Sequence, residues 1–219
     1  MSWNQAIVRK LLTAAVAASV LYILPAIGKL EALSHPQLWI LVGFGVVLSI
    51  FQPTYKPIDK SAPEHDRGTA AQIVWTVYLS QIIGVVEAVY WAYPASFRWD
   101  VVTSAALAAM VAGLGLRMWA VLTLGRYFTW FIDVHDDHKV IRSGPFRLIR
   151  HPAYGGALIL FVATLVFVHA WIAAGLSLVI QLFAYVRRIR HEETMMRDKL
   201  GDDYEAYARE VKALIPLVW

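Results

Sequence analysis

Five long apolar blocks divide this sequence, and they constrain its fold more than any other feature. The blocks cover residues 11–27, 38–51, 71–93, 101–124 and 155–186. A helix needs about 20 apolar residues to cross a membrane, so the third and fourth blocks suit one span each, and we expect flanking residues to complete the first two. The last block is too long for one span, and His169 near its middle predicts a tight hairpin of two shorter helices.

The composition supports a membrane protein. Apolar residues make up 58% of the 219 residues and charged residues only 16%, whereas soluble domains average about 25% charged. Cysteine is absent, which excludes a disulfide framework, a cysteine zinc site and a catalytic thiol. We therefore expect an all-α, polytopic membrane protein with about four full transmembrane helices, a C-terminal helical hairpin and a C-terminal amphipathic helix.

The basic residues predict the orientation. Placing the N-terminus in the cytosol puts almost every lysine and arginine between the blocks on the inside, and leaves only Lys29 and Arg98 on the opposite side. The C-terminus and the large polar segments are then cytosolic too, in a bacterial inner membrane or the endoplasmic reticulum. Arg9 and Lys10 also suit a signal peptide, but residues 25–29 offer no small-residue cleavage site, so we expect the first block to remain as a span.

Two ionisable residues lie inside the blocks. Glu87 is near the outer end of its block and Arg117 is deep in the next one, so their depths differ by about 15 Å at 1.5 Å per residue. We expect no direct salt bridge between them. Intramembrane charges are candidate functional residues, or else they make structural hydrogen bonds. We favour the structural interpretation for Glu87 and leave Arg117 open.

The polar residues collect in two segments, 125–154 and 187–219, which flank the predicted hairpin. Folding of the hairpin would bring them together at the membrane face, where they could present a water-soluble cofactor to a lipid. Residues 134–138 read Val-His-Asp-Asp-His, and their side chains could bind a metal ion. No second ligand set at helical spacing accompanies them, so we expect a solvated loop and no metal site.

The first polar segment holds a restrained loop. Gly144-Pro145 predicts a turn, and Pro152 disfavours the helical conformation for His151. His151 could act as a general base, bind a cofactor or cap the next helix.

The second polar segment predicts a helix. Arg188 and Glu192 are four residues apart and share a face of it, which taken alone suits a surface ion-pair ladder. Tyr204 and Tyr207 are three apart and predict an amphipathic lid or a core-facing stripe.

Together these two segments resemble the isoprenylcysteine carboxyl methyltransferase family of integral membrane enzymes. The residues that carry the resemblance are Gly125, His138-Lys139-Val140-Ile141, Ser143-Gly144, Arg150-His151-Pro152-Ala153-Tyr154, Arg188, Glu192-Glu193, Leu200-Gly201, Tyr204, Tyr207 and Ile215-Pro216. The resemblance covers residues 101–219, whereas residues 1–100 match only as additional apolar spans. We therefore expect N-terminal transmembrane helices over 1–100, on the acceptor side, and a methyltransferase core over 101–219.

The resemblance implies S-adenosylmethionine as the cofactor, in a cytosol-facing pocket, with S-adenosylhomocysteine as the product. The cofactor contacts that it implies are His138, Lys139, Val140, Ile141, Phe146, Arg150, His151, Pro152, Ala153, Tyr154, Glu192 and Glu193. Phe146 replaces a tyrosine of the family, and Asp133 stands where animal members have a glutamine. The implied catalytic residues are Arg188, which falls on the arginine facing the methyl acceptor, and Glu192.

The chemistry of these residues suits methyl transfer. An anionic Glu192 is favourable beside a sulfonium ion, and an in-line displacement mainly needs positioning. A carboxylate acceptor needs no base and an arginine can hold it by paired hydrogen bonds, whereas an amine or a phenol would need Glu192 or His151 to remove a proton. The membrane setting predicts a lipophilic or lipid-modified acceptor among the membrane lipids, such as a prenylated cysteine, a phospholipid amine or a quinone, and no nucleic-acid partner.

Two alternatives remain. A membrane reductase of the sterol type would bind NADPH, and Arg142, Arg147 and Arg150 could hold its extra phosphate, although Glu192-Glu193 fits the methyltransferase pattern better. A non-enzymatic membrane adaptor with the same fold would bind neither cofactor.

Overall fold

The computed structural model describes residues 3–52, 66–130 and 139–214 of the chain. The α-helices in these ranges are α1 (Trp3–Tyr22), α2 (Pro36–Ile50), α3 (Thr69–Val86), α4 (Val101–Leu124), α5 (Pro152–Phe167) and α6 (Trp171–Glu210). Short 3-10 turns lie at Leu24–Ala26, Leu30–Ser34, Ala95–Phe97, Gly125–Tyr127 and Gly144–Arg147, and a π-helical turn at Glu87–Trp91 continues α3. The architecture is therefore helical, as the apolar blocks predict.

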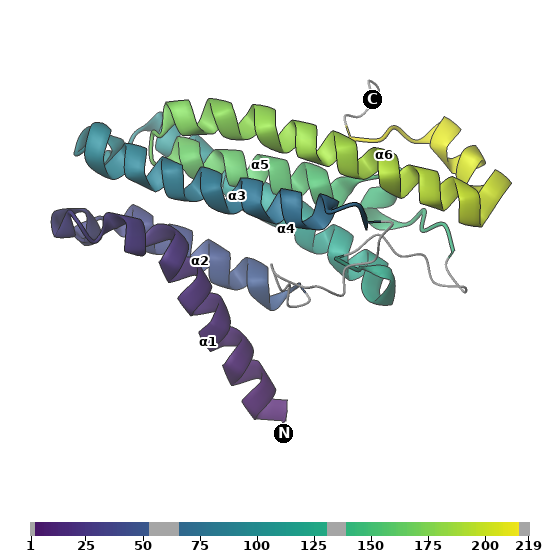
Figure 1. Ribbon diagram of the computed structural model, residues 1–219, viewed down its shortest axis with the longest axis horizontal. Helices are drawn as coiled ribbons and strands as arrows, with labels where there is room; N and C mark the ends of the chain where they lie inside the picture. Colours follow the sequence, from purple (N-terminus) through teal and green to yellow (C-terminus); the bar gives the residue numbers. More distant parts are fainter. Residues whose placement is uncertain (1–2, 53–65, 131–138, 215–219) are drawn as a thin grey trace.

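The helices α3 to α6 run side by side as a bundle, α2 lies along one side of it, and α1 packs on α2 and slants away from the bundle toward the N-terminus (Figure 1). The main packing pairs are α4 with α5, α3 with α6, α1 with α2, and α5 with α6. In the described ranges, four helices are long and apolar enough to cross a membrane: Ile7–Ala26, Thr69–Trp91, Val101–Tyr127 and Trp171–Glu210. The expected polytopic helical membrane fold is confirmed, but the fourth long helix is α6 of the predicted hairpin and not the second apolar block.

The helix α2 differs from the expectation that flanking residues complete the second apolar block. It has 15 residues, which at 1.5 Å each cover about 22 Å of a hydrocarbon core about 30 Å thick. Pro36 occupies the first turn and sets the start of the helix. At the other end Phe51 leaves the helical conformation, and Gln52 is buried beside α4. The second block is therefore a short helix packed on α1.

The hairpin predicted around His169 is present between α5 and α6. The amide of His169 donates to the carbonyl of Val166, and the amide of Ala170 donates to the carbonyl of Leu165. This pattern ends a helix when the residue after its C-cap adopts the left-handed conformation, and His169 does so with φ of 50°. The Nε2 atom of His169 lies 3.2 Å from Asp100, so the start of α4 holds the turn in place.

Glu87 fixes the start of the second helix of this hairpin. Its Oε1 accepts from the amide of Ile172 at 3.0 Å, and its Oε2 accepts from the amide of Ala173 at 2.8 Å. These amides belong to the first turn of α6, where helix donors have no partner within the helix. The structure thus gives Glu87 the structural role favoured from the sequence.

Replacing Glu87 by glutamine removes the charge and one acceptor while keeping the size of the side chain. We expect the free energy of unfolding to fall by about 1–2 kcal/mol, because a charged cap at a helix N-terminus is lost in a buried position. Thermal unfolding in detergent measures this, with Glu31→Gln on the exposed turn Leu30–Ser34 as the matched control. An unchanged unfolding temperature for Glu87→Gln would show that the cap contributes no stability.

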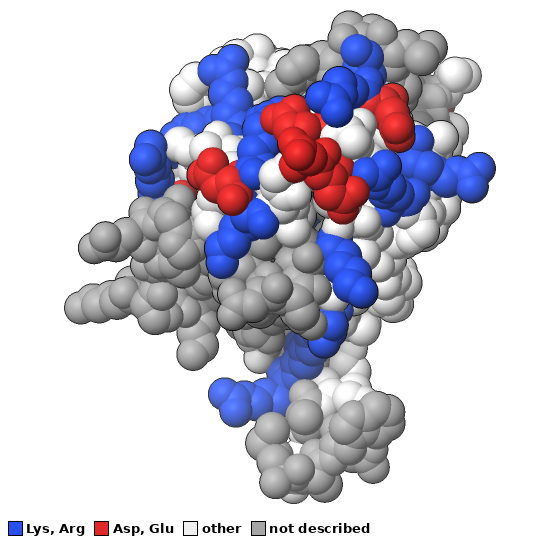
Figure 2. Space-filling model, turned by 90° about the vertical axis from the view of Figure 1, so that its right-hand side faces the viewer, with Lys and Arg blue, Asp and Glu red and all other residues white. Residues whose placement is uncertain are grey.

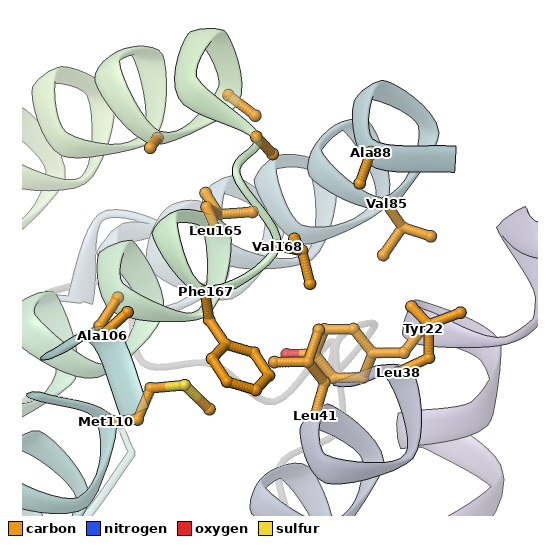
Figure 3. Close-up of a cluster of buried hydrophobic side chains, with 14 of the residues drawn as sticks. Tyr22, Leu38, Leu41, Val85, Ala88, Ala106, Met110, Leu165, Phe167 and Val168 are labelled. Carbon is orange, nitrogen blue, oxygen red and sulfur yellow. The ribbon is translucent and has the colours of Figure 1, made fainter. Parts of the chain in front are cut away.

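A cluster of buried side chains joins the α1–α2 pair to the bundle (Figure 3). In Figure 3, Phe167 from the end of α5 points toward Leu41 of α2, with Tyr22 of α1 and Met110 of α4 close by. Phe167 and Met110 are fully buried. The cluster therefore ties the N-terminal helices to the end of the molecule where the α5–α6 turn lies.

Backbone contact between α4 and α5 is closest at two glycines. A Cβ atom added to Gly156 would lie 2.6 Å from the amide nitrogen of Arg117 and 2.7 Å from the carbonyl oxygen of Gly113. A Cβ atom on Gly113 would lie 2.7 Å from the amide nitrogen of Leu160. Small residues allow this approach of membrane helices, and it places Arg117 beside the first turn of α5.

Candidate active site

The two polar segments meet at one end of the bundle. Figure 2 looks onto this end and shows acidic and basic side chains mixed over its upper part. Gly201, with φ of 51°, breaks the last stretch of α6 and turns the chain back. The amides of Arg150 and His151 then donate to the carbonyls of Lys212 and Ala213, at 2.8 and 2.9 Å. The expected convergence of the segments is confirmed for the described residues.

A cavity of about 720 Å³ extends from this end into the apolar part of the molecule. The predicted site residues that line it are Val140, Ile141, Phe146, Arg150, His151, Ala153, Tyr154, Arg188 and Glu192. Tyr204 and Tyr207, which are buried, also face it, so the tyrosine pair forms a core-facing stripe. Among the other predicted contacts, Lys139 and Pro152 do not line the cavity, and Glu193 lies behind its wall.

Some predicted positions cannot be placed. His138, Asp133 and the whole 134–138 motif lie outside the described residues. In the ranges that the structure describes, no group of three or more histidine, cysteine or acidic side chains could hold a metal ion.

The N-terminal helices supply the apolar wall of the cavity. Residues of α1, α2 and α3 line it, including Ala14, Ala18 and Tyr22 of α1 and Val74 and Val77 of α3. The polar wall comes from the loop before α5, from the start of α5 and from α6. One continuous space therefore joins side chains from residues 1–100 to side chains from residues 101–219.

His151 has the non-helical backbone that Pro152 predicts, with φ of −123° and ψ of 57°. Its Nε2 lies 3.1 Å from Oε1 of Glu193, and its Nδ1 lies 3.7 Å from Oε2 of Glu192. Arg150 donates to Oε1 of Glu193 through Nη2 at 2.7 Å. These contacts hold the loop before α5 against the part of α6 that lies beyond its apolar stretch.

The carboxylate of Glu193 is stabilised in its ionised form. Burial raises the pKa of Glu193, but the hydrogen bonds and the positive charges of His151 and Arg150 outweigh burial and lower the pKa to about 2. Arg150 also donates to the carbonyls of Ala208 and Val211. Arg150 and Glu193 thus neutralise each other and brace the final turn of α6.

Glu192 differs from its neighbour because one of its oxygens has no hydrogen-bond partner. The Oε2 atom of Glu192 is buried and has no hydrogen bond, with Nδ1 of His151 too far for one at 3.7 Å, although the side chain as a whole lines the cavity. A buried carboxylate oxygen without a partner is costly. The site therefore favours a ligand that brings a positive charge or a hydrogen-bond donor to Glu192.

Arg188 is 2% exposed and is surrounded by partners. Its Nη1 donates to Asp66 and to the hydroxyl of Thr69, its Nη2 donates to the carbonyl of Trp130, and its Nε donates to the hydroxyl of Tyr154. The ion pair with Asp66 replaces the expected surface ladder. It compensates the charge of Arg188 with a carboxylate that is itself 1% exposed.

Sequence reasoning missed Asp66. Its side chain accepts from the amide of Ala70 and from the hydroxyl of Thr69 at the start of α3, so Asp66 caps the helix although Gly68 occupies the N-cap position. The available signal was an aspartate three residues before the threonine at which an apolar helix begins. That signal predicts a cap, whereas the pairing with Arg188 requires the folded chain.

Arg117 is the second buried arginine of the cavity wall, and its partners are neutral. Its Nη1 donates to the carbonyl of Ala153 at 3.0 Å, and its Nη2 donates to Oε1 of Gln52 at 2.7 Å. The residue is 7% exposed, and its Nε has no partner. Glu87 binds the far end of α6, so the predicted absence of a salt bridge between Glu87 and Arg117 is confirmed.

The cations proposed for an NADPH phosphate are mostly occupied. Arg142 pairs with Asp203 at 2.8 Å on the surface, and Arg150 pairs with Glu193. Arg147 is exposed and does not line the cavity. This arrangement disfavours the reductase alternative, because a phosphate needs cations whose charge is free.

The fold and the site define a polytopic helical membrane protein whose cavity joins an apolar wall to a charged end. Residues 106–198 match the family model described as the isoprenylcysteine carboxyl methyltransferase (ICMT) family. The resemblance stated from the sequence is thereby confirmed.

Curated relatives agree with this match. A probable protein-S-isoprenylcysteine O-methyltransferase of Oryza sativa subsp. indica is 38% identical over 115 residues, which is 51% of this chain and 60% of the relative. Protein-S-isoprenylcysteine O-methyltransferase B of Arabidopsis thaliana is 33% identical over 114 residues, 51% of this chain and 58% of the relative. The matched segment thus spans about 60% of the length of these relatives.

A solved structure shares the fold. It is described as the eukaryotic intramembrane Ras methyltransferase, isoprenylcysteine carboxyl methyltransferase, without a monobody. The TM-score is 0.64, and the alignment covers 92% of this chain and 74% of that chain at 21% sequence identity. The likeness extends to the N-terminal helices, which the family match does not include.

Proposed function

We propose that this protein is an integral membrane methyltransferase that moves a methyl group from S-adenosylmethionine to a lipophilic acceptor. The observation that carries the proposal is the continuity of the cavity, which joins the unpaired carboxylate oxygen of Glu192 to the apolar wall of α1, α2 and α3. A polar cofactor and a lipid tail can then meet in one space. The names of the relatives, which refer to isoprenylcysteine, support the same activity.

The residues at the polar end suit the cofactor. S-adenosylmethionine supplies an electrophilic methyl group on a positively charged sulfur. Glu192 offers an anionic oxygen that lacks a partner, Val140 and Ile141 offer apolar surface, and the backbone of Ala153 and the ring of Tyr154 complete the wall. Lys139, Pro152 and Glu193 belong to the segments that form this wall without lining the cavity, and His138, outside the described residues, stays a predicted contact.

The chain contributes to transfer mainly by positioning. A nucleophilic oxygen of the acceptor forms a bond to the methyl carbon while the carbon–sulfur bond breaks, and the electron pair stays on sulfur in S-adenosylhomocysteine. Glu192 holds the positive end of the donor, and Arg188 fixes Tyr154 through its Nε at 3.1 Å. The buried Tyr204 and Tyr207 also line the cavity. They limit the space around the reacting groups and so help to keep them aligned.

The membrane placement follows from the charge distribution. Arg9 and Lys10 precede the apolar part of α1, and the arginine-rich half of α6 lies at the same polar end of the cavity. We therefore place both polar segments and the cofactor site on the cytosolic side, by the preference of basic residues for that side.

Cofactor binding tests this proposal directly. We expect isothermal calorimetry on detergent-purified protein to show binding of S-adenosylmethionine and none of NADPH. Glu192→Gln is expected to weaken the binding by about tenfold or more, which corresponds to about 1.4 kcal/mol, because the glutamine carries no charge for the sulfonium. Glu210→Gln, on the exposed end of the same helix, is the matched control.

The alternatives give different results in the same experiment. Binding of NADPH without S-adenosylmethionine would contradict the methyltransferase and support the reductase. Binding of neither cofactor by protein that unfolds cooperatively would support the adaptor.

A further inference from the structure

The residues that line the cavity carry more positive than negative charge. The basic residues that line it are Arg9, Lys10, Arg117, Arg150 and Arg188, and Glu192 is the acidic one among the described lining residues. Glu193 compensates Arg150, and Asp66 compensates Arg188, both from behind the wall. The positive charge that remains lies on Arg9 and Lys10 in the N-terminal half of α1 and on Arg117 inside the cavity.

Arg188 has little capacity left for an acidic ligand. A guanidinium has five N–H donors, and four hydrogen bonds from Arg188 already go to Asp66, Thr69, Trp130 and Tyr154. A carboxylate held by two parallel hydrogen bonds needs two free donors along one edge. An acidic group could take that place only by breaking the buried ion pair with Asp66.

Arg117, in contrast, still has the capacity to bind an acidic ligand. Two hydrogen bonds engage it, and both acceptors, the Ala153 carbonyl and the Gln52 amide, are neutral. Its Nε is buried without a partner, and no acidic side chain among the described residues pairs with it. A buried charge without a counter-ion is expensive, so an arriving anion is more strongly favoured at Arg117 than at any other cation of the wall.

The position of Arg117 suits a group that must reach the cofactor. Its hydrogen bond to the carbonyl of Ala153 places the guanidinium against the His151–Tyr154 segment, which forms the polar wall. Its other partner, Gln52, follows α2, which lines the apolar wall. Arg117 therefore lies where the two walls meet.

We propose that Arg117 receives the acidic group of the methyl acceptor, while Arg188 acts as a positioning residue for Tyr154. The inference rests on the proposed function and on a carboxyl acceptor of the kind that the family description names; its new element is Arg117 as the residue that binds the carboxylate, with the apolar tail along α1 and α3. Attack by a carboxylate oxygen on the methyl carbon breaks the carbon–sulfur bond and yields a neutral ester and a neutral thioether. The ester has no charge for Arg117 to hold, so the reaction itself weakens the binding of its product.

The test compares an acid with its uncharged counterpart. We use N-acetyl-S-farnesylcysteine and its primary amide, with the protein in phosphatidylcholine nanodiscs and without S-adenosylmethionine. The wild-type protein is expected to bind the acid about tenfold more tightly than the amide. Arg117→Gln is expected to remove this difference by weakening the acid alone, Arg117→Lys to keep part of it, and the exposed Arg147→Gln to leave it unchanged.

Several outcomes would overturn the proposal. An acid preference that persists in Arg117→Gln, or that is absent from the wild-type protein, contradicts it. If Arg117→Gln does not fold, a structure of the wild-type complex with the acid decides: a carboxylate on the Arg117 guanidinium supports the proposal, and a carboxylate on Arg188 overturns it. Displacement of the acid when phosphatidylglycerol is added to the nanodisc, with no methyl ester of the acid formed once S-adenosylmethionine is supplied, would make Arg117 a lipid headgroup site and also overturns it.

The same preparations separate this inference from the proposed function. Calorimetry with S-adenosylmethionine reports on the methyltransferase alone. Loss of acid preference in Arg117→Gln with intact cofactor binding supports Arg117, whereas absence of cofactor binding in the wild-type protein refutes the methyltransferase whatever Arg117 does.

Discussion

Gly156→Ala is expected to lower the free energy of unfolding by about 3 kcal/mol, at the upper end of the range for overpacked sites. The added Cβ atom would lie 2.6 Å from the amide nitrogen of Arg117 and 2.7 Å from the carbonyl oxygen of Gly113. Both neighbours are backbone atoms of α4, so neither can move away by a rotamer change. The helices α4 and α5 must separate, which removes their closest contact.

A glycine on the partner helix α4 provides the control. A Cβ atom at Gly115 of α4 meets nothing within 4 Å, and alanine is favoured over glycine inside a helix by about 0.5–1 kcal/mol. Gly115→Ala should therefore leave the stability unchanged or raise it slightly. Unfolding in detergent by a denaturant series measures both variants, and equal unfolding midpoints would contradict the role assigned to the α4–α5 contact.

Gly156→Ala should also affect ligand preference. The shift of α4 moves the backbone of Arg117 away from the Ala153 carbonyl, 3.0 Å from its Nη1 atom. We expect any folded fraction of the variant to show a reduced preference for the farnesylated acid over its amide.

Arg188→Met is expected to destabilise the protein by about 3–5 kcal/mol, the cost of breaking a buried ion pair by removing one partner. The carboxylate of Asp66 is 1% exposed and would lose this cation. The double variant Arg188→Met with Asp66→Asn removes both charges and keeps the side-chain oxygen that caps α3. We expect it to recover most of the lost stability.

The double-mutant cycle in denaturant gives the coupling between these two residues. Arg142→Met serves as the control, because Arg142 and Asp203 form an exposed pair with side chains 39% and 65% accessible, and such pairs contribute at most about 1 kcal/mol. If Arg188→Met costs no more than Arg142→Met, or if the double variant is no more stable than Arg188→Met, the buried pair does not stabilise the fold.

The sequence predicts the features that depend on neighbouring residues along the chain. The apolar blocks predict the spans, and the break at His169 predicts the hairpin, because both follow from local composition. The spacing of Tyr204 and Tyr207 predicts that they share a face, and the fold decides that this face is buried. Convergence of the polar segments follows from the hairpin itself.

Other features depend on contacts between distant parts of the chain. Asp66 and Arg188 are 122 residues apart, and Gln52 and Arg117 are 65 residues apart. No local pattern couples residues at such separations, so the compensation of Arg188 and the neutral environment of Arg117 emerge only in the folded protein. The short length of α2 was not predicted either. It depends on Pro36 at the start of the helix and on the burial of Gln52 after its end, and this burial is a contact with a distant part of the chain.

The return of the chain after Gly201 has a consequence for biosynthesis. The carbonyls of Lys212 and Ala213 accept from the amides of Arg150 and His151, so the loop before α5 is held by residues that are translated after all the described helices. The apolar wall begins on α1, which is translated before the other described helices. A nascent chain that has already inserted its membrane helices therefore still lacks the contacts that hold the loop before α5, and a ligand that needs this loop binds only after insertion.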